Sequence, residues 1–203
     1  MLHYLFILGI TVEAITGALS AGRKDMDIMG AIIIAVVTAL GGGTVRDILI
    51  GHYPLTWIEN PNYIMITIAA ALITVIFCTW IRKLTKIFLI LDALGLATFA
   101  VIGTKIAMDC HFHPVIIAVI AMVNGICGGM LRDILCNDVP LVLRNELYAT
   151  VALFASITYM GLHHLFPNLF IAELVTVALA FLLRIIAIYN HLEIPKFTYD
   201  TST

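Results

Sequence analysis

Seven apolar segments dominate this chain, and each has about the length needed to cross a lipid bilayer. A membrane-spanning helix needs about 20 mostly apolar residues, and 62% of the residues here are hydrophobic while only 12% are charged, too few for a water-soluble surface. We therefore predict an all-α integral membrane protein with seven transmembrane helices. The predicted spans are 2–21, 28–50, 62–81, 87–108, 114–136, 146–163 and 168–189.

Other classes of protein fit the sequence poorly. A formal net charge of −2 without any long Lys/Arg run argues against a nucleic-acid-binding protein, which needs a concentrated basic face. No motif resembles a hydrolase triad, a phosphate-binding loop or a clustered metal site, and the four cysteines form no C-x-x-C pair. We expect no enzymatic activity, no metal site and no cofactor.

The sequence repeats itself with an offset of 86 residues. Gly42–Leu49 (GGTVRDIL) aligns with Gly128–Leu135 (GGMLRDIL), and the same offset pairs Gly9 with Gly95 and Gly17 with Gly103. Each repeat contains three predicted helices, an odd number, so the second repeat should enter the membrane from the opposite face. We predict a 3+3 inverted repeat, with residues 1–86 and 87–167 as its halves, a seventh helix at 168–190 and a polar cytoplasmic tail at 191–203.

Positive charges set the predicted orientation, because cytoplasmic loops carry an excess of Lys and Arg. In the seven-helix topology these residues fall on one side, which places the N-terminus outside and the C-terminus in the cytoplasm. They are Arg23, Lys24, Arg82, Lys83, Lys86, Arg144, Arg184 (at the end of the seventh helix) and Lys196.

Two glycine clusters lie at equivalent positions, Gly41-Gly42-Gly43 in helix 28–50 and Gly125 with Gly128-Gly129 in helix 114–136. Glycine is about 1 kcal/mol less favourable than alanine in a helix, and free backbone groups in lipid need protein or water partners. We therefore predict that both helices are interrupted and line one shared polar cavity. The alternative is close packing of intact helices through small residues.

Polar residues beside these glycines are candidate ligands for a solute. Thr38, Thr44 and Asn124 could act in this way or could satisfy freed backbone groups. Glu13, near the middle of the first helix, has Phe99 at the equivalent position of the second repeat. This acid, which has no equivalent in the second repeat, should favour cations along the path.

Arg46-Asp47 and Arg132-Asp133 are charged pairs inside predicted spans, where an ionisable residue costs at least about 2.5 kcal/mol. They must face protein or water, either to lock their helix to a neighbour or to contact a solute. Because adjacent residues on a helix point about 100° apart, we expect their partners elsewhere. Depth along the helices at about 1.5 Å per residue predicts that Lys105 lies beside Asp47, and Asp92 beside Arg132 with Asp133.

These motifs in a frame of this length resemble the trimeric intracellular cation channel (TRIC) family. The strings EAITGALSAG (Glu13–Gly22) and TALGGGTVRDILIGHYPLTW (Thr38–Trp57) are similar to its bacterial branch. The resemblance implies a homotrimer in the bacterial inner membrane, in contact with lipid. Each protomer would then contain a path for potassium and sodium ions, lined by kinked second and fifth helices. The second glycine motif carries Cys127 where the first has Gly41.

Some bacterial relatives of this kind are described as glycine transporters, which keeps a second function open. Carbonyls and hydroxyls near acidic side chains would suit potassium, whereas a zwitterion such as glycine needs an arginine or a helix N-terminus for its carboxylate and an acid for its ammonium. We predict a monovalent cation channel, with a glycine or small neutral amino-acid transporter as the alternative. A non-transporting scaffold is a third possibility.

Overall fold

The computed structural model describes residues 2–78, 84–144, 147–166, 170–190 and 192, and the described chain is all-helical. The predicted tail, apart from Leu192, and the charges of Arg82, Lys83 and Lys196 lie outside these residues. The helices are α1 (Leu2–Gly22), α2 (Ile28–Ile50), α3 (Thr56–Glu59), α4 (Asn62–Phe77), α5 (Leu84–Asp109), α6 (Pro114–Leu135), η2 (Leu141–Leu143), α7 (Tyr148–Leu165) and α8 (Phe170–Tyr189).

The long helices coincide with the predicted segments. Among the described residues, α1, α2, α5, α6 and α8 are long and apolar enough to cross a bilayer, while α4 is a shorter apolar helix of 16 residues. The short helices α3 and η2 were not predicted, and they follow α2 and α6 respectively. The protein is therefore an all-α integral membrane protein.

Local sequence signals explain where α2 and α6 begin and end. The Asp27 side chain accepts a hydrogen bond from the Gly30 N–H (2.7 Å), and His113 caps α6 just before Pro114. After the helices, Gly51 (φ 69°) and Asn137 (φ 53°) adopt left-handed backbone, which these two residue types tolerate best. The two helices therefore end with equivalent turns, 86 residues apart.

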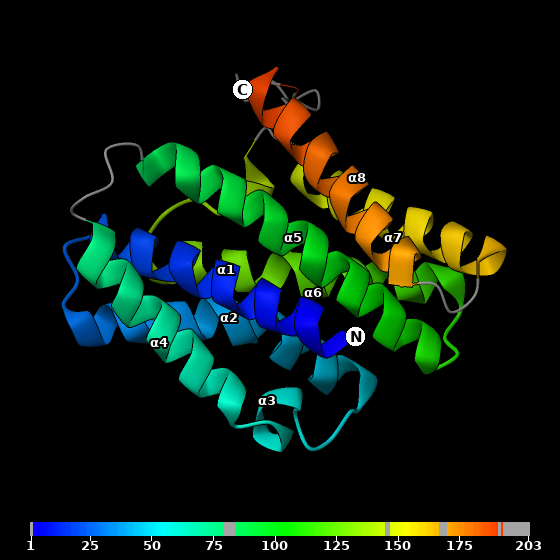
Figure 1. The fold of residues 1–203 in the computed structure, drawn as a ribbon, viewed down its shortest axis with the longest axis horizontal. Coiled ribbons are helices and arrows are strands. Elements are labelled where there is room, and N and C mark those ends of the chain that lie inside the picture. Colours follow the sequence, from blue (N-terminus) through cyan, green and yellow to red (C-terminus); the bar gives the residue numbers. More distant parts are fainter. Residues whose placement is uncertain (1, 79–83, 145–146, 167–169, 191, 193–203) are drawn as a thin grey trace, which may run out of the picture.

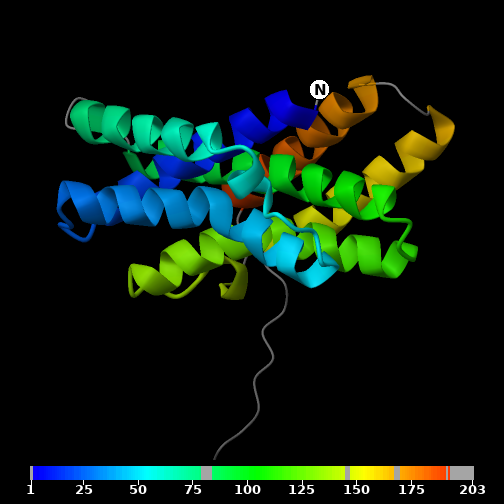
Figure 2. The ribbon, with the colours of Figure 1, turned by 90° about the horizontal axis from the view of Figure 1, so that it is seen from below.

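The helices α1, α2, α5 and α6 form the centre of the bundle. In Figure 1, α4 lies at one edge and α8 at the opposite edge, where α4 packs against α1 and α2 while α8 packs against α5 and α7. Figure 2 shows the same bundle from below, with the long helices in stacked layers. This arrangement places the two glycine-rich helices, α2 and α6, in contact at the core.

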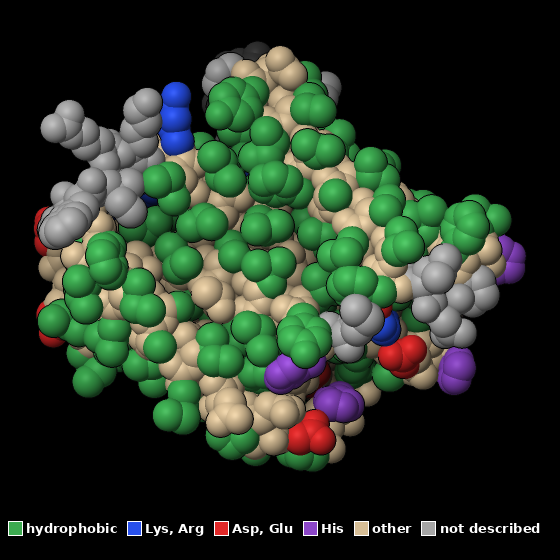
Figure 3. Space-filling view, in the orientation of Figure 1, with side chains coloured by type: hydrophobic (Ala, Val, Ile, Leu, Met, Phe, Trp, Pro, Cys, Tyr) green, Lys and Arg blue, Asp and Glu red, His purple; other side chains and the backbone are tan. Residues whose placement is uncertain are grey.

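The outer surface is apolar over broad areas. Large exposed hydrophobic side chains on the outer helices include Ile73, Ile76, Leu174, Leu179 and Leu182. In Figure 3 apolar side chains cover most of the visible face, and charged and histidine side chains gather towards its edges. Contiguous apolar surface of this extent is unusual on soluble monomers, and it fits a lipid-facing surface.

Candidate functional site

The glycine clusters allow two intact helices to touch. A Cβ atom on Gly42 would lie 2.4 Å from the carbonyl oxygen of Asn124, and one on Gly128 would lie 2.3 Å from the carbonyl oxygen of Thr38. Both α2 and α6 run without interruption through these positions. The predicted helix breaks are therefore wrong. Each unpaired backbone group in lipid costs several kcal/mol, more than the roughly 1 kcal/mol by which a glycine weakens a helix.

Close contacts at the core occur in pairs related by the 86-residue offset. Gly42 against Asn124 corresponds to Gly128 against Thr38. In the same way, a Cβ on Gly17 would meet Ala35 and Thr38, while one on Gly103 would meet Ala121 and Asn124. Gly9 faces Phe99, and Gly95 faces Glu13.

Most of the predicted path residues surround one narrow central space of about 200 Å³, no part of which is wide enough for a water molecule. Its lining contains Glu13, Thr38, Ala39, Gly42, Phe99, Asn124, Gly125, Gly128 and Gly129. Two of the polar side chains there are engaged with backbone, since Thr38 donates to the Ile34 carbonyl (2.6 Å) and Asn124 Nδ2 donates to the Phe99 carbonyl (2.6 Å). The space is closed in this conformation.

Three predicted path residues lie beside this space rather than in its lining. A Cβ on Gly41 would meet the Leu131 side chain at 2.8 Å, and Gly43 faces Arg46. Thr44 donates to the Leu40 carbonyl and accepts a hydrogen bond from Trp57 Nε1 (3.0 Å). Their contacts are with protein.

Arg46 and Asp47 form a cluster with Thr56 at the start of α3 and with Asn124 of α6. Arg46 donates through Nε and Nη2 to Asp47 Oδ1 (2.9 and 2.7 Å), through Nη2 to Thr56 Oγ1 (3.0 Å) and through Nη1 to Asn124 Oδ1 (3.3 Å). Asp47 Oδ2 accepts from the backbone N–H and the hydroxyl of Thr56, both at 2.8 Å. One positive and one negative charge balance here.

Arg132 occupies the equivalent position in α6, with more acidic neighbours. Its Nη1 donates to Asp92 Oδ1 (2.8 Å) and Thr16 Oγ1 (3.1 Å), and its Nε donates to Asp133 Oδ1 (2.9 Å). Glu13 Oε2 lies 3.8 Å from Nη1. All these side chains are buried, and the predicted Asp92–Arg132 pairing is confirmed. One guanidinium group thus faces three carboxyl groups.

Two sequence-based expectations about charge pairing are wrong. Each arginine does bind the aspartate next to it, because the long arginine side chain can fold back across the helix surface despite the angle between neighbouring residues. Lys105 forms its ion pair with Glu173 of α8 rather than with Asp47. The expected depth of Lys105 in the bilayer could not indicate which face of α5 carries its side chain.

Four residues that contact the buried charges, namely Thr56, Phe88, Tyr148 and Glu173, were not among the sequence candidates. Thr56 completes the Arg46 cluster and Glu173 binds Lys105. The guanidinium carbon of Arg132 lies 4.7 Å from the centre of the Phe88 ring, and that of Arg184 lies 4.7 Å from the centre of the Tyr148 ring. Glu173 was visible as a lone acid in an apolar run, but nothing in the sequence marked Phe88 or Tyr148.

The structure corrects the predicted place of one charge, Arg184. It was predicted to lie at the cytoplasmic end of the last helix, yet its side chain is fully buried inside the bundle. Its contact with Tyr148 joins α8 to α7. An arginine that packs inside the bundle gives no information on which end of its helix faces the cytoplasm.

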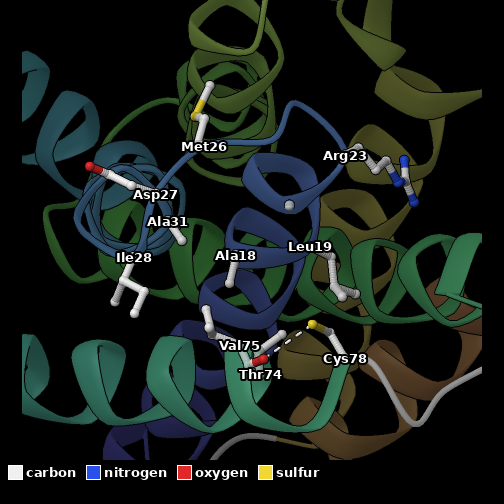
Figure 4. A pocket seen from close by; sticks show the side chains of 11 residues that line it. Ala18, Leu19, Arg23, Met26, Asp27, Ile28, Ala31, Thr74, Val75 and Cys78 are labelled. Carbon is white, nitrogen blue, oxygen red and sulfur yellow. Dashed lines mark hydrogen bonds between the residues drawn. The ribbon is translucent and has the colours of Figure 1, made fainter.

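A separate cavity, with about 280 Å³ of room for water-sized molecules, lies away from the buried charges, between α1, the start of α2 and the end of α4. Figure 4 shows Ala18 and Leu19 of α1, Ala31 of α2 and Val75 of α4 around it. The Arg23 side chain is directed away from these residues, and its guanidinium group lies 4.3 Å from the Phe88 ring centre. The lining is mainly apolar, so this cavity offers little to hold a charged solute.

The fold and the site together define a polytopic membrane protein with ionisable residues buried at the centre of its helix bundle. A family model described as "Glycine transporter" matches residues 3–79 and 89–164, and the chain belongs to this family.

The relatives agree with this assignment. The UPF0126 inner membrane protein YadS of Escherichia coli strain K12 is 35% identical over 202 residues, covering 98% of both chains. The UPF0126 membrane protein YvgT of Bacillus subtilis is 37% identical over 150 residues, covering 73% of this chain and 74% of YvgT.

Solved structures confirm the resemblance to TRIC channels. The TRIC trimeric intracellular cation channel orthologue from Rhodobacter sphaeroides is 34% identical, with a TM-score of 0.89 over 94% of this chain and 98% of the orthologue. A structure described as the basis for conductance through TRIC cation channels is 32% identical, with a TM-score of 0.87 over 98% of both chains.

Proposed function

We propose that this protein is a monovalent cation channel in which each protomer carries a path for potassium or sodium ions between α2 and α6. The observation that supports this most directly is the Arg132 cluster, where three carboxyl groups surround one guanidinium group at the centre of the bundle. Ionisable residues buried in a membrane protein commonly mark ion pathways, and an excess of acids favours cations. The likeness to TRIC cation channels supports the same function.

The membrane topology of the proposal has seven spans arranged as two inverted halves and a seventh helix. The family model matches two segments that begin 86 residues apart, at residues 3 and 89, which supports the halves 1–86 and 87–167. The paired glycine contacts support the same division. The proposed orientation has the N-terminus outside and the C-terminus in the cytoplasm. The description of YadS supports the inner membrane, and that of the TRIC orthologue supports a homotrimer.

Conduction in this proposal requires α2 and α6 to move apart, because the central space is too narrow for water. Separation at Gly42 and Gly128 would uncover the carbonyl oxygens of Asn124 and Thr38, which now pack against the glycines. Carbonyl oxygens can replace the water ligands of a potassium ion. Glu13, which lines the same space, would keep the local potential negative.

Glycine transport is the second candidate function, and the family description favours it. One structural observation also does so. Arg132 Nη2 is buried without a hydrogen-bond partner among the described residues, and a guanidinium N–H is a good donor to a carboxylate. Glu13 lines the central space, and Arg132 Nη1 lies 3.8 Å from its carboxylate. A zwitterion requires such an acid and an arginine close together.

Reconstitution of the purified protein into liposomes and planar bilayers separates the two functions. The channel proposal predicts currents that reverse near the potassium equilibrium potential in a potassium gradient, and a strong reduction of these currents in Glu13→Gln. Gly161→Ala is the control, since a Cβ there meets no atom within 4 Å. Uptake of labelled glycine without potassium current would overturn the channel proposal and support the transporter.

A further inference from the structure

The two buried arginines occupy equivalent positions but have unequal partners. Arg46 Nη2 donates both to Asp47 and to the Thr56 hydroxyl. Arg132 Nη2 is buried and has no hydrogen-bond partner within the described chain. The residue 86 positions after Thr56 is Val142, which has no hydroxyl group. One strong donor of the second cluster is therefore unused.

A glycine, Gly129, faces this donor. A Cβ on Gly129 would lie 3.2 Å from the hydroxyl oxygen of Tyr148 and 3.4 Å from Arg132 Nη2. Gly129 therefore stands where the hydroxyl and the guanidinium group converge, and it also lines the central space together with Glu13. The equivalent glycine, Gly43, lies 3.7 Å from Arg46 Nη2 by the same construction and is not part of that lining.

Resting on the glycine-transport candidate above, we propose that Arg132 Nη2 and the Tyr148 hydroxyl form a carboxylate subsite against Gly129. Both groups donate hydrogen bonds, and a carboxylate accepts from both. Glu13, on the same central space, takes the ammonium group of the ligand. The short distances of 3.2 and 3.4 Å around a Cβ at Gly129 leave little room there, so the subsite takes only the smallest amino acids.

The proposal explains why the acids outnumber the arginine in the second cluster. Asp92 and Asp133 are both within 2.9 Å of Arg132 and hold its guanidinium group in place. Glu13 is further away, 3.8 Å from Nη1, and is hydrogen-bonded through Oε2 to the Thr16 hydroxyl. It is thus the carboxyl group of the three that is most available to a cation.

Equilibrium binding of labelled glycine to the purified full-length protein tests the subsite. Unlabelled glycine should compete at least about tenfold better than acetate, methylammonium or leucine, since each of these lacks one charge or exceeds the space. Acetate alone competing as well as glycine would show an anion site and overturn the zwitterion assignment. Absence of glycine binding in protein that conducts potassium would overturn the subsite and leave the channel proposal standing.

Two variants test the residues themselves. Gly129→Ala fills the space with a small clash, and Tyr148→Phe removes one donor while keeping the ring that Arg184 contacts. Each should weaken glycine binding by about tenfold, the loss expected for one hydrogen bond to a charged group. Gly43→Ala, the same change at the equivalent position, should retain wild-type affinity. Equal losses in Gly43→Ala and Gly129→Ala, or wild-type binding by both Gly129→Ala and Tyr148→Phe, would overturn the assignment.

Discussion

Substitution of Gly42 by alanine tests the role of the glycines in helix packing. The added Cβ would lie 2.4 Å from the Asn124 carbonyl oxygen, whereas ordinary contact begins at 3.4 Å. The obstacle is backbone on the facing helix, which cannot rotate away as a side chain can. Thus α2 and α6 must separate by about 1 Å at this contact in the bundle core.

The expected loss follows from two opposing effects. Overpacking of a tight interface costs about 1–3 kcal/mol, while replacing glycine by alanine in a helix gains up to about 1 kcal/mol. We expect Gly42→Ala, and Gly128→Ala by the same reasoning, to be destabilising by about 1–2 kcal/mol on balance of those terms. Gly43→Ala, whose Cβ would have only an ordinary 3.7 Å contact, should instead be stabilising by up to about 1 kcal/mol.

The double variant of Gly42→Ala and Gly128→Ala tests whether the two contacts are coupled. Once the helices have separated to admit one methyl group, the second should fit at lower cost. The double variant Gly42→Ala/Gly128→Ala should therefore lose about 1 kcal/mol less than the sum of the single losses, as expected for contacting residues.

Thermal unfolding in detergent, with membrane-fraction blots as the control for insertion, gives the comparison. Shifts of the melting temperature in the same direction for Gly42→Ala and Gly43→Ala would contradict this packing model. Strictly additive losses of stability for Gly42→Ala and Gly128→Ala would also contradict it.

Three further predictions concern the ion pairs. Lys105→Met should lose about 2–3 kcal/mol, because Glu173 is then buried without its partner, and Glu173→Gln should restore part of the loss in detergent melting experiments; additive losses would refute the pairing. Arg132→Met should lose at least about 3 kcal/mol by leaving three acids uncompensated, whereas Asp92→Asn should lose less because two acids remain, so equal losses would contradict this charge balance. The hydrogen bond from Lys24 lowers the pKa of Asp138. The wild type should therefore be more stable than Asp138→Asn at neutral pH, and this difference should disappear as the pH falls below the ordinary aspartate pKa of about 4. A difference in melting temperature that does not depend on pH would refute this prediction.

The helices and one charge pair could be predicted from the sequence because each depends on a one-dimensional pattern. Apolar run length determined the spans, and position along the helices placed Asp92 near Arg132. The same reasoning failed for Lys105, because depth gives one coordinate and the rotation of α5 about its axis decides whether Lys105 meets Asp47 or Glu173.

The state of the glycine clusters could not be decided from the sequence, since one residue type both weakens a helix and permits close packing. The deciding atoms, the carbonyl oxygens of Thr38 and Asn124, belong to the facing helices. The partners of the buried arginines were similarly hidden. Thr56 reaches Arg46 only because the loop after α2 folds back over it, and the sequence carries no signal for that return.

A chain made of two identical first halves would keep every glycine at the α2–α6 crossing, because Gly42 and Gly128 use equivalent contacts. It would have Phe6 where Asp92 now stands, and so only one neighbouring aspartate for each central arginine. The close crossing and the acidic cluster are therefore separable properties. Gene duplication could supply the scaffold complete, and a few substitutions confined to one half could then create a new chemistry without disturbing the symmetric frame.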